Sequence, residues 1–178
     1  MGGIHMSGSF LLTQKLKKMK KVLFILVAAL LVISCGPSKT AIDARKTFRG
    51  DWVLNSITYP NNPGDFNVTL FNEASASCFQ GSMWSFVSNN NTGTYTLQGP
   101  GCEATGERYF NWSIDEENTP DGAYDLMLKP TDDRYRSTTG NQGFRINLRQ
   151  LSETSMTWEQ TVTLEGSPFV IQMNFTKL

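Results

Sequence analysis

From Asp51 onward, apolar and polar side chains alternate along the sequence with a period of two. In the last such run, Phe169, Ile171, Met173 and Phe175 fall on one face, and Gln172, Asn174 and Thr176 fall on the other. This alternation is typical of half-buried antiparallel strands, because successive side chains of a strand point to opposite faces. Helical spacing is convincing nowhere in this region. The pattern therefore predicts an all-β domain.

Nine runs of strand-like composition are separated by short connectors. We predict strands at residues 51–59, 66–71, 82–88, 93–98, 107–115, 123–129, 143–151, 154–164 and 168–177. The connectors are rich in Gly, Pro and Asn and are too short for crossover helices, so sequential strands should pair as antiparallel hairpins. Closing the sheet would hide its edges. The leading prediction is an up-and-down β-barrel of about eight strands over residues 50–178, with a β-sandwich as the alternative.

Residues 20–35 combine two lysines, an unbroken apolar run and a cysteine. The run from Val22 to Ile33 is too short to span a bilayer, but it has the length of a signal-peptide core. It ends in Val32-Ile33-Ser34-Cys35, which resembles the bacterial lipobox. We therefore expect residues 1–34 to be a cleaved signal peptide and Cys35 to carry acyl chains such as palmitate.

Two further expectations concern the N-terminal region. Met19-Lys20-Lys21 is a complete positively charged region directly before the apolar run, so translation is predicted to start at Met19. Residues 35–49 would tether the domain to the membrane, and a helical turn within Thr40–Phe48 would close one end of the domain.

The composition after residue 34 excludes several classes of partner. Residues 35–178 contain eleven Lys and Arg against sixteen Asp and Glu, a balance of −5. A nucleic-acid partner is therefore not expected, because phosphate neutralisation needs clustered basic residues. The membrane would be bound through the acyl chains alone. These 144 residues are enough for a single domain with a substantial core.

The remaining histidine, cysteine and acidic residues predict no enzyme, metal site or cofactor. The single histidine, His5, lies in the segment expected to be removed, which excludes catalysis by Ser-His-Asp or Cys-His groups. Acidic groups at residues 115–121 and 132–133 do not match calcium-loop spacing, so they are predicted to be solvated turns. Four arginines would either meet an anionic ligand at the barrel mouth or belong to the polar outer face: Arg134, Arg136, Arg145 and Arg149.

Two cysteines flank the most specific local pattern of the sequence. Placing the aromatic residues of 82–88 and 93–98 on one face predicts pairs Trp84–Leu97 and Phe86–Tyr95, with a turn at Asn89–Thr92. This register brings Cys78 within one residue of Cys102 at the open end of the hairpin. Because paired cysteines in an exported protein more often form a disulfide than a metal site, we predict a Cys78–Cys102 bridge.

The order Gly50-Asp51-Trp52, then Cys-Phe-x-Gly-Ser-x-Trp from Cys78, then Asn-Asn-x-Gly-x-Tyr before Cys102, resembles the lipocalin-like lipoproteins of Bacteroidetes. The resemblance implies a calyx-shaped barrel, with Gly50 and Trp52 as a structural motif at its closed end. Lipocalins usually stack an arginine on that tryptophan, and here Lys177 would take its place. The resemblance also implies the periplasmic face of the outer membrane, because no acidic run follows Cys35.

Aromatic residues on the apolar faces of separate strands are the candidate ligand-binding residues: Trp84, Phe86, Tyr95, Phe110, Trp112, Tyr124, Trp158 and Phe175. In a barrel of about eight strands, the interior is either filled by side chains or just wide enough for one small ligand. Two functions remain open. The first is an envelope lipoprotein that binds a small apolar or amphipathic molecule in its barrel. The alternative is a structural or interaction lipoprotein with a filled barrel whose outer surface binds protein or glycan.

Overall fold

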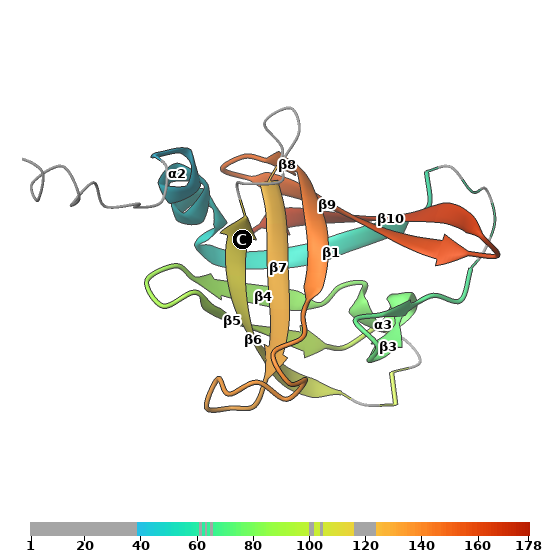
Figure 1. Cartoon of the computed structure of the whole chain (residues 1–178), viewed down its shortest axis with the longest axis horizontal. Coiled ribbons are helices and arrows are strands. Elements are labelled where there is room, and N and C mark those ends of the chain that lie inside the picture. Colours follow the sequence, from blue (N-terminus) through green and yellow to red (C-terminus); the bar gives the residue numbers. More distant parts are fainter. Residues whose placement is uncertain are drawn as a thin grey trace, which may run out of the picture. The chain divides into compact units, whose positions relative to one another are not determined.

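Eight antiparallel strands form a closed β-barrel, which confirms the predicted fold class and rules out the sandwich alternative (Figure 1). The strands are β1 (Gly50–Thr58), β4 (Met83–Val87), β5 (Thr92–Leu97), β6 (Gly106–Asp115), β7 (Tyr124–Thr131), β8 (Phe144–Leu151), β9 (Ser155–Leu164) and β10 (Ser167–Lys177). Their order around the barrel is β1-β10-β9-β8-β7-β6-β5-β4. Strands β4 to β10 therefore form a meander, and β1 closes it by pairing with both β4 and β10.

The computed structural model describes residues 39–60, 62, 64, 66–99, 102–103, 105–115 and 124–178. The described residues belong to one compact unit, Ser38–Leu178. The predicted signal peptide, the start at Met19 and the lipidated Cys35 lie outside the described residues. Among the described residues, no helix has both the length and the apolar character needed to cross a bilayer.

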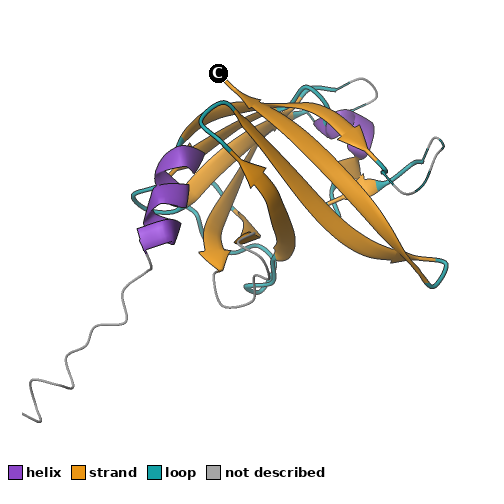
Figure 2. Cartoon of the chain, turned by 90° about the horizontal axis from the view of Figure 1, so that it is seen from above, coloured by secondary structure: helices purple, strands orange, loops and turns teal. Residues whose placement is uncertain are grey.

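A helix, α2 (Lys39–Phe48), precedes the barrel and is longer than the single turn predicted within Thr40–Phe48. Its apolar side chains Ala44 and Phe48 are buried, and its last turn carries Arg45 and Lys46, which suit the negative end of the helix dipole. Figure 2 shows α2 beside the end of the barrel at which β1 begins. The helix therefore closes that end, as the sequence suggested.

The segment between β1 and β4 differs from the predicted strand 66–71. Only β2 (Thr69–Leu70) is extended, and it pairs with β3 (Ala74–Ser75) in a small separate sheet, followed by the short helix α3 (Ala76–Phe79). The strand ends early because Phe71 and Asn72 adopt positive φ angles of 53° and 55°. These left-handed residues form a tight turn, in which the Glu73 amide donates to the Leu70 carbonyl at 2.9 Å.

The predicted register of the β4–β5 hairpin is wrong by two residues. Trp84 pairs with Tyr95, not with Leu97, and Phe86 pairs with Gly93, not with Tyr95. The faces remain correct, because a shift of two residues preserves the alternation. The physical reason lies at Gly93: a Cβ atom there would come within 2.3 Å of the Phe110 ring, so only glycine fits opposite Phe86.

The turn of this hairpin is also displaced from the predicted Asn89–Thr92. It occupies residues 88–91, and β5 already begins at Thr92. Asn91 supplies the left-handed conformation, with φ at 55°, and the Asn90 side chain accepts a hydrogen bond from the Thr92 hydroxyl at 2.8 Å. The turn therefore depends on Asn90 and Asn91 rather than on the Thr92-Gly93 pair.

Strands β9 and β10 extend beyond the barrel as a projecting hairpin, visible at the right of Figure 1 and again in Figure 2. Residues 161–168 at its tip are exposed. Val162 and Leu164, which the alternation assigned to an apolar face, are 36% and 45% exposed. The alternation in the sequence places both side chains on the correct face of β9, but this part of the strand lies outside the closed core.

Candidate functional site

Seven of the eight aromatic residues predicted to line a cavity lie in the barrel core. Each is at most 4% exposed: Trp84, Phe86, Tyr95, Phe110, Trp112, Trp158 and Phe175. They come from β4, β5, β6, β9 and β10, so the closure of the sheet gathers them as expected. Tyr124, at the start of β7, is only half-buried and packs against the edge of this core.

The rings of this set contact one another across the barrel. The Trp84 ring stacks on Tyr95 with a centroid separation of 4.3 Å, and it meets Trp158 edge-on at 5.3 Å. The Trp158 ring in turn lies 4.5 Å from Phe175. These are normal separations for aromatic pairs in contact. Because β4 and β9 lie on different walls, the protein's own rings occupy the interior at this level.

Rings from outside the strands cover this core at both ends. At the α2 end, Phe48 lies 5.1 Å from Phe86 and 5.4 Å from Trp112. At the other end, Phe79 lies 6.4 Å from Trp84 and Phe71 lies 6.1 Å from it. Phe48, Phe71 and Phe79 were not among the predicted interior residues. Phe48 ends α2, Phe71 follows the short strand β2, and Phe79 ends α3, so none of them lies in a barrel strand.

Among the described residues, four buried side-chain polar atoms lack a hydrogen-bond partner, and one of them belongs to the ring cluster. The indole nitrogen of Trp158 is buried and unbonded. The other three tryptophans each donate, for example Trp84 to the Ser82 hydroxyl at 2.7 Å and Trp112 to the Thr92 carbonyl at 2.9 Å. An unsatisfied buried donor costs about 1–3 kcal/mol. A water molecule or a ligand acceptor at Trp158 would remove that cost.

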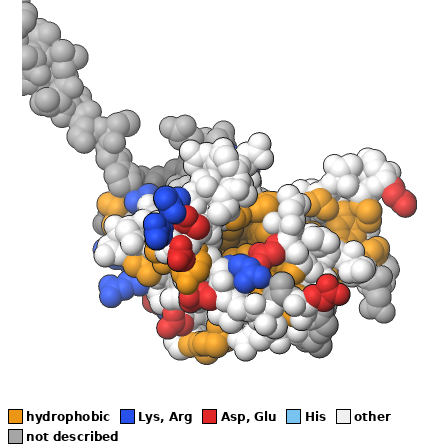
Figure 3. All heavy atoms as spheres, turned by 90° about the horizontal axis from the view of Figure 1, so that it is seen from below, with side chains coloured by type: hydrophobic (Ala, Val, Ile, Leu, Met, Phe, Trp, Pro, Cys, Tyr) orange, Lys and Arg blue, Asp and Glu red, His pale blue; other side chains and the backbone are white. Residues whose placement is uncertain are grey.

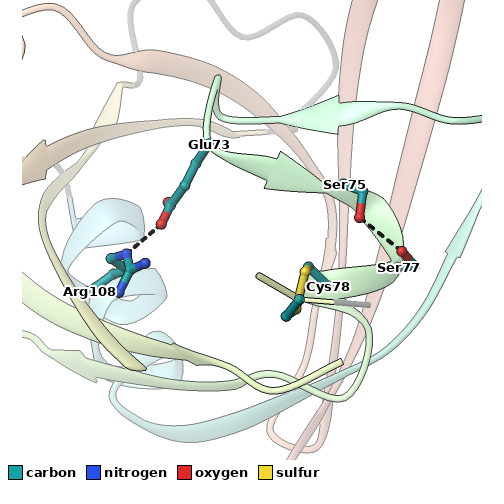
Figure 4. Close-up of a disulfide and its surroundings, with 6 residues drawn as sticks. Glu73, Ser75, Ser77, Cys78 and Arg108 are labelled. Atoms are coloured by element: carbon teal, nitrogen blue, oxygen red, sulfur yellow. Dashed lines mark hydrogen bonds and ion pairs between the residues drawn. A yellow bond between two sulfur atoms is a disulfide. The ribbon is translucent and has the colours of Figure 1, made fainter. Parts of the chain in front are cut away.

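A polar group that is only partly buried fastens the β2–β3 turn to the barrel. Glu73 accepts hydrogen bonds from the Tyr95 hydroxyl and from the Arg108 guanidinium, and Figure 4 shows its side chain reaching toward Arg108. Burial raises the pKa of Tyr95 above its usual value near 10, and the hydrogen bond to Glu73 raises it further. Tyr95 is therefore neutral at physiological pH. The arrangement connects three chain segments and places Phe71 over the core.

The predicted Cys78–Cys102 disulfide is present, with a Cα separation of 5.1 Å (Figure 4). Its setting differs from the prediction, because Cys78 belongs to α3 and not to a strand of the hairpin. Gly99 approaches this helix closely, and its amide donates to the Cys78 carbonyl at 3.2 Å. The bridge therefore fastens the segment that covers one end of the core to the connection after β5.

Two depressions lie along β4, one at its end beside the start of β1 and the other between β1, β4 and β5. One, of about 410 Å³, is lined by Arg49, Gly50, Phe86, Val87, Ser88 and Asn89. The other, of about 240 Å³, is lined by Asp51, Met83, Trp84, Ser85, Thr94 and Thr96. Met83 and Val87, which line them, are 46% and 40% exposed. This surface combines apolar side chains with hydroxyl groups, and we call it the β4 face.

Several of the charged residues considered as possible sites pair with one another. Asp132 accepts two hydrogen bonds from the Arg136 backbone and side chain, which together with its Arg134 contact lower its pKa. Arg145 binds Asp125 at 2.7 Å. In the described part of the chain, no group of His, Cys, Asp or Glu side chains is placed to hold a metal. Glu116, Glu117 and Asp121 lie outside it.

The structural motif predicted at the closed end has the expected arrangement. Trp52 is fully buried, and its indole donates to the Phe48 carbonyl at 2.9 Å. The Lys177 ammonium lies 5.1 Å from the centre of the Trp52 ring and donates to the Thr47 carbonyl at 2.8 Å. The lysine therefore takes the stacking position, and it also fastens the end of α2 to β10.

Comparisons with known proteins add no family to this description. No protein-family model matches the chain, and no curated protein matches it.

Proposed function

We propose that the chain is a membrane-anchored envelope lipoprotein with a lipocalin-like barrel whose filled interior leaves its outer surface to bind a protein or a glycan. The observation that supports this best is the contact between Trp84, Trp158 and Phe175 across the barrel, because it fills the space that a carrier would keep open. The rings of Phe48 and Phe71 cover the two ends of this core.

The lipocalin-like assignment is supported by the closed eight-stranded meander and by Trp52 with its stacked lysine. The proposed anchor rests on the apolar run and lipobox-like sequence that end at Cys35. Acyl chains on Cys35 would hold the protein in the outer membrane, on its periplasmic face. Helix α2 begins four residues after Cys35, so the barrel would lie near the membrane surface.

The β4 face is the proposed binding surface. Its exposed Met83 and Val87 offer apolar contact, and Ser85, Thr94 and Thr96 offer hydroxyl groups beside them. Such a mixture suits a protein or glycan partner, since both are bound by apolar contacts with hydrogen bonds around them. Among the described residues that line its two depressions, the charged ones are Arg49 and Asp51, of opposite sign, so we expect no strong preference for ligands of one charge.

The surface is tested by placing a photo-crosslinking amino acid at Val87 in cells that make the full chain. We expect a discrete adduct from this position. The matched control is Gln150, which is also exposed but lies on β8. Adducts of equal yield from both positions, or from neither, would count against the β4 face.

The anchor is tested separately with Cys35→Ser. Without a thiol to receive the lipid, this variant should accumulate as an uncleaved precursor and should not incorporate labelled palmitate. Two acyl chains give stable membrane attachment, whereas one is marginal. Ser34→Ala is the control, because it keeps a small residue before the cysteine. Unchanged palmitate incorporation in Cys35→Ser would contradict the proposed anchor.

A second candidate function is the binding of a small apolar or amphipathic molecule inside the barrel. The observation that favours it is the buried, unbonded indole nitrogen of Trp158, which could donate to a polar group of such a molecule. A ligand of more than a few atoms would have to displace the rings around Trp158. Entry of apolar compounds into the native barrel would therefore support the small-molecule function, and exclusion of them would support the surface-binding function.

A further inference from the structure

Strand β9 has an open edge where it leaves the barrel. In the described ladders, β8 pairs with β9 only from Met156 to Glu159, whereas the pairing of β9 with β10 continues to Leu164. Among the residues that the structure describes, 160–164 therefore have a strand neighbour on one side only. Figure 2 shows this part of the hairpin projecting away from the other strands.

The hydrogen-bond alternation identifies which backbone groups face the open edge. The Lys177 amide donates to the Thr154 carbonyl at 2.9 Å, and this pair continues the β9–β10 register. In an antiparallel ladder, every second pair is hydrogen-bonded. Even-numbered residues of β9 therefore bond to β10, and the N–H and C=O groups of Thr161 and Thr163 point to the open edge.

This edge lacks the features that usually protect a sheet edge. Residues 160–164, Gln-Thr-Val-Thr-Leu, contain no charge and no proline. Val162 and Leu164 are partly exposed, and hydrophobic side chains gather at the right of Figure 3, the side on which the hairpin projects. The other edge of the hairpin contains Pro168, which has no N–H group to offer. The open edge of β9 is therefore the one suited to pairing.

We propose that the open edge of β9 pairs antiparallel with the same edge of a second copy of the chain, around a two-fold axis at Val162. Thr161 of each copy then lies opposite Thr163 of the other. These two residues supply four outward N–H groups and four outward C=O groups in the dimer, which together form four hydrogen bonds. Other registers would use fewer of these groups. A second copy is favoured because the edge is complementary to itself, with threonine opposite threonine and no like charges among residues 160–164.

The charges that flank the edge are compatible with this register. Glu165 of the second copy comes opposite Glu159, which would be repulsive for two isolated carboxylates. However, Arg149 binds the Glu159 carboxylate at 3.0 Å, and its side chain is 58% exposed. The guanidinium can therefore lie near both carboxylates. This inference does not depend on the anchor or on the β4 face.

Disulfide trapping in intact cells tests the geometry. The two-fold axis places residue 162 of one copy opposite residue 162 of the other, as a pair without mutual hydrogen bonds. The Cα atoms of such a pair are about 4.5 Å apart, a separation that a disulfide can bridge. Val162→Cys in the full chain should give a covalent dimer on a non-reducing gel. The control is Ser167→Cys, which is exposed on β10 of the same hairpin. Equal dimer yields from both variants, or none from Val162→Cys, would overturn the proposal.

The role of the backbone is tested by light scattering of the full chain purified in detergent. Thr163→Pro removes an outward N–H group that β10 does not use, so the barrel should remain folded while the dimer is lost. Thr163→Val changes the same side chain but keeps the N–H group, so it should remain dimeric. A monomeric wild-type protein at the highest attainable concentration, or a Thr163→Pro variant that is still dimeric, would overturn the proposal.

Discussion

Single residues hold the closed end of the barrel together. Trp52 is buried under α2, donates to Phe48 and carries the Lys177 ammonium above its ring. The same ammonium binds the Thr47 carbonyl, so one side chain fastens the last turn of the helix to the last strand. The sequence predicted that Lys177 would stack on Trp52, because no arginine follows Arg149 to take that position. It did not predict the bond to Thr47, which depends on how α2 folds back.

Removing this lysine should weaken the closed end. Lys177→Ala loses a cation–π contact and a charge-assisted hydrogen bond, so we expect the free energy of unfolding to fall by about 1–3 kcal/mol. Lys177→Arg should retain most of this stability, because a planar guanidinium also stacks on an indole. Urea unfolding followed by tryptophan fluorescence measures both variants. Equal losses for Ala and Arg would show that the stacked cation contributes nothing.

Tyr95 should make stability depend on alkaline pH. Its pKa is raised in the folded state, so the folded protein keeps this proton when the unfolded chain loses it above about pH 10. Its contribution is therefore complete below pH 10 and is lost as the pH rises above that value. Tyr95→Phe also removes the hydrogen bond to Glu73, which should cost about 2 kcal/mol at neutral pH.

The comparison between wild type and Tyr95→Phe isolates this effect. Urea unfolding at a series of pH values should show a stability difference that is largest below pH 10 and narrows above it. Tyr109→Phe, at a half-buried tyrosine that donates to Glu107, is the comparison for removal of a hydroxyl. The hydrogen bond to Glu107 also raises the pKa of Tyr109, so its stability difference should narrow above pH 10 in the same direction. A Tyr95→Phe difference that stays constant through the alkaline range would contradict the pKa argument.

Among the elements, the eight barrel strands were predictable because each buries one face. Alternation located every one of them to within about two residues at each end. The segment from Phe66 to Ser82 was not predictable in this way, because its residues pack against the end of the barrel and not within the sheet. The register of β4 and β5 failed for a related reason. It depends on the contact between Gly93 and Phe110, which lie on different strands.

The disulfide should be most important to this irregular segment. It closes a loop between residues 24 apart and should contribute about 3 kcal/mol by restricting the unfolded chain. Cys102→Ala should therefore lower the melting temperature by several degrees, and both native cysteines should be unreactive toward thiol reagents. Calorimetry with and without reducing agent measures this. The melting temperature of Cys102→Ala should not respond to the reductant, and reductant should lower that of the wild type.

At the scale of the whole molecule, the main question that the sequence left open was whether the barrel is filled. The aromatic residues of separate strands were predicted to point inward, and seven of them do. Whether these inward side chains leave a cavity depends on their size and on the residues that cover the ends of the barrel. Phe48, Phe71 and Phe79 were not predicted for that role, yet they complete the ring cluster.

The most direct test of this account is a titration of the unit from Ser38 to Leu178 with fatty acids, isoprenoids and a fluorescent apolar probe. Tryptophan fluorescence reports entry, since a ligand inside must contact Trp84 or Trp158. Phe110→Ala is the positive control, because removing a buried ring should open an apolar void, at a cost of about 3–5 kcal/mol in stability. A filled barrel predicts saturable binding by folded Phe110→Ala and none by the wild type. Saturable quenching of the wild type, lost in a folded Trp158→Phe variant, would contradict a filled barrel and establish the small-molecule function instead.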